Sequence, residues 1–145
     1  MSLQNLVGVS LETITPSKQT IRRLLQGAAR HIADAKVNAV SSETRFGAAY
    51  TAIRMLADLG LHAHGYRTLT SKPGHHQTAI QTLPLSMGLE PQVIVRLDAL
   101  RKQRNLTEYT GETIPESAVE ECLSRAEALY GTAAAWLTAN RPELL

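Results

Sequence analysis

The stretch from Ser41 to Gly65, SSETRFGAAYTAIRMLADLGLHAHG, has the pattern of an amphipathic helix. Its apolar residues recur at intervals of three and four, which places them on one side of a helix. They are Phe46, Ala49, Tyr50, Ile53, Leu56, Ala57 and Leu61. The serine pair and Glu43 favour a helix start, and Gly65 favours its end, whereas Gly60 is not expected to interrupt it. The small residues at 47–52 allow a neighbouring helix to approach closely.

Four further segments share this period, so the sequence predicts five helices. Beside 41–65, they cover approximately residues 16–38, 75–83, 91–108 and 115–140. Their predicted core includes Leu24, Ile53, Leu56, Leu97, Leu100, Leu123 and Trp136. Residues 66–74, YRTLTSKPG, read as a loop. With mostly short connections and no convincing strand pair, the expected fold is an all-α, five-helix up-and-down bundle.

Residues 1–15 have no helical period and are expected to form an irregular arm, with an extended piece at 6–11. Two interpretations stay open for this arm: it packs on a partner chain, or it is a frayed terminus. Residues 16–145 then form one helical domain, because the chain has the length of a single domain.

Composition excludes several classes of protein. The single cysteine, Cys122, cannot form an internal disulfide, and no apolar run reaches the roughly 20 residues of a membrane helix. No basic region followed by an apolar stretch opens the chain, so a cytoplasmic protein is expected. Cations gather at Arg96–Arg104, but the net charge of +2 is too small by itself to predict nucleic-acid binding. No metal or cofactor motif is present, and His62 and His64 are spaced to point apart.

The chemistry-bearing stretch is LDALRKQRNLTEYTG, residues 97–111. Arg101 and Arg104 lie three apart, so both project from one side of a helix, and a guanidinium suits phosphate. Lys102 adds a third cation, and Asn105 can cap the helix end or orient its neighbour. Tyr109 lies about 140° round an ideal helix from Arg104, so the two meet only if the helix unwinds near residue 107. The alternative interpretation is a solvated basic face.

His75 and His76 follow a Lys-Pro-Gly turn and open the short third helix. They are candidates to bind phosphate beside Arg101, Lys102 and Arg104, and to supply an imidazole to the site. The alternative is that both are merely exposed residues at a helix start.

The Arg104-Asn105-x-x-x-Tyr109 pattern, near the end of the fourth helix, resembles the HEPN family. The resemblance extends through GHHQTAIQTLPLSMG at 74–88 and through the helix at 42–66. It implies a five-helix, typically dimeric bundle. Many HEPN domains are metal-independent ribonucleases with an Arg-x4-6-His motif, and others bind nucleotides or act as non-catalytic partners. Arg104 takes the position of the family's arginine, Asn105 its polar neighbour, and Tyr109 stands in place of the histidine.

Two functional hypotheses follow. In the first, a HEPN-like homodimer binds RNA or nucleotide phosphate through Arg104, Asn105 and Tyr109. It then has weak or no metal-independent endoribonuclease activity, because a tyrosine with a pKa near 10 is a poor base. In the second, the domain is a non-catalytic association module, such as one component of a toxin–antitoxin pair, with an antitoxin or a nucleotidyltransferase as its partner.

Overall fold

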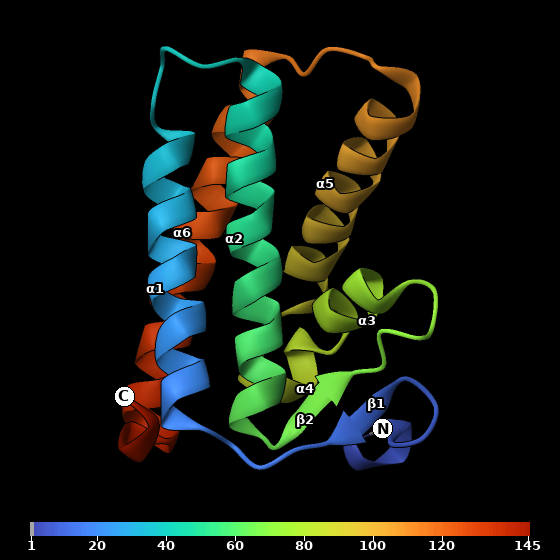
Figure 1. Cartoon of the computed structure of the whole chain (residues 1–145), viewed down its shortest axis with the longest axis vertical. Helices are drawn as coiled ribbons and strands as arrows, with labels where there is room; N and C mark the ends of the chain where they lie inside the picture. The colour runs from blue at the N-terminus through green and yellow to red at the C-terminus, as the bar shows by residue number, and fades with distance from the viewer. Residues whose placement is uncertain (1) are drawn as a thin grey trace.

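Helix α2 (Ser42–Ala63) is the central element of the fold (Figure 1). The structure is a computed structural model and describes residues 2–145. Helices α1 (Lys18–Ala35) and α6 (Glu116–Asn140) pack along α2, and α5 (Pro91–Thr110) leans against its other side. Both chain termini lie at the same end of the bundle. The predicted all-α bundle is confirmed.

Local sequence signals account for the helix ends. The Ser41 hydroxyl accepts a hydrogen bond from the Thr44 N–H at 3.1 Å, as expected for the N-cap of α2. Helix α1 begins at Lys18 instead of Pro16, because the Ser17 hydroxyl caps it by accepting from the Thr20 N–H at 3.2 Å. Gly65 follows the end of α2 with φ +87°, a conformation that glycine adopts without strain.

The core is built around the apolar side of α2. Within α2, Phe46, Tyr50, Ile53 and Leu56 are fully or almost fully buried. Leu97 and Leu100 of α5 are buried as predicted. Leu24, Leu123 and Trp136 are only partly buried, although they pack against the core.

A small antiparallel sheet was not predicted. Strand β1 (Leu11–Thr13) pairs with β2 (Tyr66–Thr68), and a 3-10 turn (Gln4–Leu6) precedes them. The proposed extended piece at 6–11 and the loop at 66–74 are therefore corrected. Leu11 is fully buried, so the N-terminal arm is anchored to the bundle. Strands of three residues are too short to show an alternating pattern, and their pairing joins distant parts of the chain.

The predicted third helix is in fact two short helices, α3 (His75–Gln81) and α4 (Leu83–Met87). Pro84, which directly follows the helix predicted at 75–83, lies in the first turn of α4, where its missing N–H costs no hydrogen bond. Helix α5 runs on to Thr110, two residues past the predicted end. A second short 3-10 turn (Pro142–Leu144) ends the chain. Among residues 2–145, no helix has the length and apolar character to cross a membrane.

Candidate phosphate-binding site

Helix α5 is regular through the whole predicted motif, so Arg101 and Arg104 lie on successive turns of one side. The Arg101 Nε donates to Asp98 Oδ1 at 2.8 Å, and its side chain is only 15% exposed. Lys102 Nζ approaches the other oxygen of Asp98 at 3.5 Å but is 71% exposed. One carboxylate thus pairs with a largely buried arginine and with an exposed lysine.

Arg104 is held by two contacts. Its guanidinium carbon lies 5.3 Å from the centre of the Tyr50 ring, within the range of a cation–π interaction. Its Nη2 also lies 3.3 Å from Glu108 Oε1, one turn further along α5. The guanidinium is therefore aimed at α2, while the side chain as a whole keeps 30% of its surface exposed.

The Tyr50 ring, over which Arg104 lies, has a hydroxyl in an unusual environment. The ring is buried, and its hydroxyl has no hydrogen-bond partner in the described chain. Burial raises the pKa of Tyr50, although the nearby Arg104 and Arg101 cations oppose this effect. The Tyr50 hydroxyl therefore stays protonated and uncharged at neutral pH, and the ring contacts the Arg104 guanidinium without forming an ion pair with it.

Helix α2 contributes a third arginine that the sequence motif did not include. Arg54 and Asp58 lie one and two turns beyond Tyr50, and the Arg54 Nη1 is 3.6 Å from the Asp58 Oδ2. Burial raises the pKa of Asp58 to about 6, against the opposing charges of Arg54 and His75. The i,i+4 spacing of Arg54 and Asp58 is visible in the sequence, but only the packing of α3 and α5 on α2 places them beside the motif arginines.

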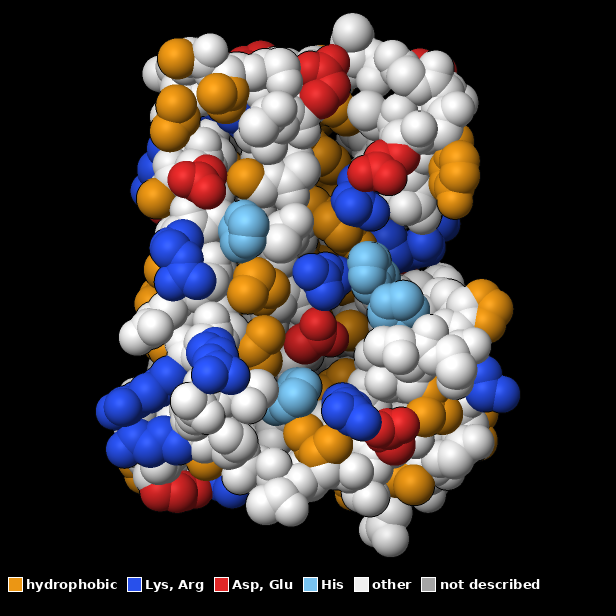
Figure 2. Space-filling view, viewed as in Figure 1, with side chains coloured by type: hydrophobic (Ala, Val, Ile, Leu, Met, Phe, Trp, Pro, Cys, Tyr) orange, Lys and Arg blue, Asp and Glu red, His pale blue; other side chains and the backbone are white. Residues whose placement is uncertain are grey.

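His75 and His76 lie at the start of α3, which packs on both α2 and α5. Their ring centres are 4.5 Å apart in an edge-to-face arrangement. The pKa of His76 is lowered to about 4, first by partial burial and then by the cations Arg54, His75, Arg104 and Arg101. Figure 2 shows an adjacent histidine pair at the tip of α3 with Lys or Arg side chains around it. We call Arg54, Arg101, Arg104, His75 and His76 the basic cluster.

Tyr109 is the motif residue that the structure does not bring to this cluster. Its side chain is 89% exposed, because α5 does not unwind near Thr107. Tyr109 and Arg104 therefore keep the angular separation of an ideal helix. Asn105 is partly buried beside Arg104. The two ends of the predicted Arg-Asn-x-x-x-Tyr motif thus point in different directions.

A hollow of about 280 Å³ lies beside Arg104, where the end of α5 diverges from the start of α2. It is lined by Glu43, Phe46, Gly47, Thr51, Arg104, Thr107, Glu108 and Ile114. This volume lies just below the usual range of small-molecule sites, and the carboxylates of Glu43 and Glu108 line the hollow together with Arg104, so its lining is not predominantly cationic.

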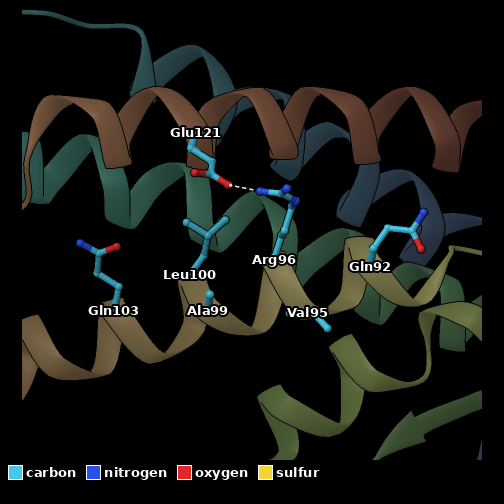
Figure 3. A pocket seen from close by; sticks show the side chains of 7 residues that line it. All are labelled: Gln92, Val95, Arg96, Ala99, Leu100, Gln103 and Glu121. Atoms are coloured by element: carbon cyan, nitrogen blue, oxygen red, sulfur yellow. Dashed lines mark ion pairs between the residues drawn. The ribbon is translucent and has the colours of Figure 1, made fainter.

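A separate hollow of about 520 Å³ opens on the other flank of α5, facing α6 (Figure 3). Its only ion pair in the figure joins Arg96 Nη1 and Glu121 Oε1 at 3.9 Å. Val95 and Ala99 also line it. The hollow contains no member of the basic cluster, which shows that Arg96 serves a different surface from Arg101 and Arg104.

No group of three or more His, Cys, Asp or Glu side chains in residues 2–145 is arranged to hold a metal ion. Burial raises the pKa of Cys122 to about 12, so its thiol stays protonated. No protein-family model, curated protein or solved structure matches the chain.

Proposed function

We propose that the protein is a HEPN-like dimeric domain that binds the phosphate of RNA or of a nucleotide, with weak or no metal-independent ribonuclease activity. The observation that carries this proposal is that α3, which bears His75 and His76, packs against α5, which bears Arg101 and Arg104. These residues belong to different helices, so their meeting is a property of the fold. A row of cations on one solvated helix face would not produce it.

The ion pairs of the cluster leave room for a phosphate ligand. Each guanidinium has five N–H donors, and each carboxylate pair uses only one or two of them. Glu108, the partner of Arg104, is 61% exposed, and such a pair contributes little to stability. A phosphate group that accepts two parallel hydrogen bonds can therefore displace Glu108 at small cost.

Weak or absent cleavage is expected because Tyr109 lies away from the cluster and because His76, whose pKa is lowered to about 4, is a weak base. Cleavage without a metal needs a base at the ribose 2′-hydroxyl and a cation at the phosphate. Arg104 can supply the cation, but Tyr109 is exposed on another side of α5. The residue in the family's histidine position thus supplies no base to the site.

The dimer part of the proposal rests on the small-residue side of α2. Gly47, Ala48 and Thr51 line a hollow of about 410 Å³ between α1 and α2. Val37 and Val40, at the same rim, are exposed apolar residues. A second copy of the chain can bury this surface about a two-fold axis.

A second candidate function, protein association without catalysis, is favoured by the flank of α5 shown in Figure 3. Val95 is 70% exposed there, and Leu106 further along α5 is also exposed. An antitoxin or a nucleotidyltransferase that covers this flank would make the domain one half of a two-protein system.

An RNA-binding titration separates the two candidates. Fluorescence anisotropy with a labelled oligouridylate, and in parallel with a labelled ATP, is measured from low to physiological salt. Phosphate binding predicts that affinity falls steeply with salt and that Arg101→Ala and Arg104→Ala each weaken it. Arg96→Ala is the matched control, because it removes the same charge from the other flank of α5. Unchanged binding in the Arg101→Ala/Arg104→Ala double variant would leave only the association function.

A further inference from the structure

His76 has an environment that the sequence motif does not explain. Its helix, α3, packs on α2 and α5, the helices of Arg54, Arg101 and Arg104, and His75 stacks edge-to-face against its ring. Figure 2 shows the histidine pair with Lys or Arg side chains around it. Asp58, which pairs with Arg54, is the carboxylate on the α2 side, and Asp98, which pairs with Arg101, is on the α5 side. A histidine beside three guanidinium groups is kept uncharged as long as no anion is present.

We propose that Arg54 and His76 belong to the phosphate site, and that His76 takes up one proton when a phosphodiester group of RNA enters the cluster. This inference rests on the function proposed above. It adds two residues outside the motif, and it assigns to the site a ligand that remains singly negative over the whole pH range in which histidine titrates.

The charge balance of the cluster explains why a proton accompanies the anion. In the free protein, a protonated His76 would be a fourth cation among the arginines. A phosphodiester brings a negative charge into contact with the same ring, and an opposite charge within about 4–6 Å favours the charged form of a group. The protonated ring can then donate a hydrogen bond to a phosphate oxygen from either nitrogen. Neutral imidazole can donate from only one of its nitrogens.

The sign of the pH dependence follows directly. The pKa of His76 in the free protein is about 4, and the bound phosphate raises it. RNA binding therefore strengthens as the pH falls from 7 towards 5. Asp58 is an alternative source of the same trend, since its pKa is about 6 and its carboxylate loses charge over the same range. The experiment must distinguish these two groups.

Nuclear magnetic resonance on the full chain does so. The ring Cε1–H signals of His75 and His76 are assigned with the His75→Gln and His76→Gln variants and followed against pH, with and without oligouridylate. We expect the RNA to raise the pKa of His76 by at least about one pH unit, equivalent to tenfold tighter binding to the protonated form. His31 lines the hollow between α1 and α2, away from the basic cluster, and is the internal control. Its ring signal should not change when RNA is added.

Calorimetry in two buffers of different ionisation enthalpy then counts the protons taken up at pH 5, where a rise in the His76 pKa from about 4 to 5 or more binds at least about 0.4 of a proton. We expect uptake by the natural protein and by Asp58→Asn, and almost none by His76→Gln. Arg54→Gln should weaken RNA binding and raise the pKa of His76 in the free protein.

Four outcomes would overturn the inference. If RNA binds but the pKa of His76 does not rise, or if proton uptake disappears in Asp58→Asn and persists in His76→Gln, His76 is not the acceptor and the proposed function still stands. If Arg54→Gln binds RNA as the natural protein does, Arg54 is not part of the site. If oligouridylate does not bind at all, the RNA-binding function fails together with this inference.

Discussion

Replacing Arg104 with alanine tests both the site and its support. The side chain makes a cation–π contact with Tyr50 and an exposed pair with Glu108. A partly desolvated cation–π contact contributes about 1 kcal/mol and the exposed pair about 0.4 kcal/mol. Arg104→Ala is therefore expected to lower the free energy of unfolding by about 1–2 kcal/mol. For a chain of this length, that is a fall in Tm of roughly 3–6 °C.

The loss in RNA affinity is expected to be larger than the loss in stability. A charge-assisted hydrogen bond to phosphate contributes about 1.5–3 kcal/mol, so Arg104→Ala should weaken binding roughly 10- to 100-fold. It should also reduce the slope of log affinity against log salt by about one, because one fewer phosphate charge is neutralised.

The assay is anisotropy at four salt concentrations with thermal melts of the same samples. Arg96→Ala should change neither the affinity nor its salt slope by a comparable amount, since Arg96 faces α6 across an exposed pair with Glu121. The reasoning is refuted if Arg104→Ala and Arg96→Ala bind RNA equally well. An unchanged melting temperature in Arg104→Ala would separately refute the role assigned to the Tyr50 contact.

Three further predictions concern catalysis, pH and assembly. Tyr109→His should not create Arg104-dependent cleavage of a structured RNA in EDTA, because the new ring would be exposed on another side of α5; a gel showing robust cleavage would contradict this. Since folding raises the pKa of Asp58 from 3.8 to about 6, this carboxyl favours the folded state below pH 4, and that stability is lost as the pH rises through 6. In denaturant unfolding, the free energy of unfolding of Asp58→Asn should therefore rise by about 2 kcal/mol relative to that of the natural protein between pH 4 and 7. Parallel pH profiles of the two proteins would rule this out. Light scattering coupled to gel filtration should give a dimer mass that Ala48→Glu converts to a monomer mass, whereas a monomeric natural protein would remove the α1–α2 surface as an interface.

The helices could be predicted from the sequence because the interactions that make them are local. Apolar residues three and four apart in 41–65 predict the buried side of α2, and Ser41 and Gly65 predict its ends. The same spacing argument places Arg101 and Arg104 on one side of α5. It also predicts that Tyr109 and Arg104 diverge on a continuous helix, which is what the structure shows.

The tertiary structure alone decided which groups meet at the candidate site. Arg54, His76 and Arg104 belong to α2, α3 and α5, and no sequence spacing relates a residue of one helix to a residue of another. The pairing of β1 with β2 is also decided by the tertiary structure, because the end of α2 sets the position of β2 and with it the register of the pair. The uncharged state of His76 is likewise a tertiary property, because it depends on partial burial and on cations contributed by other helices.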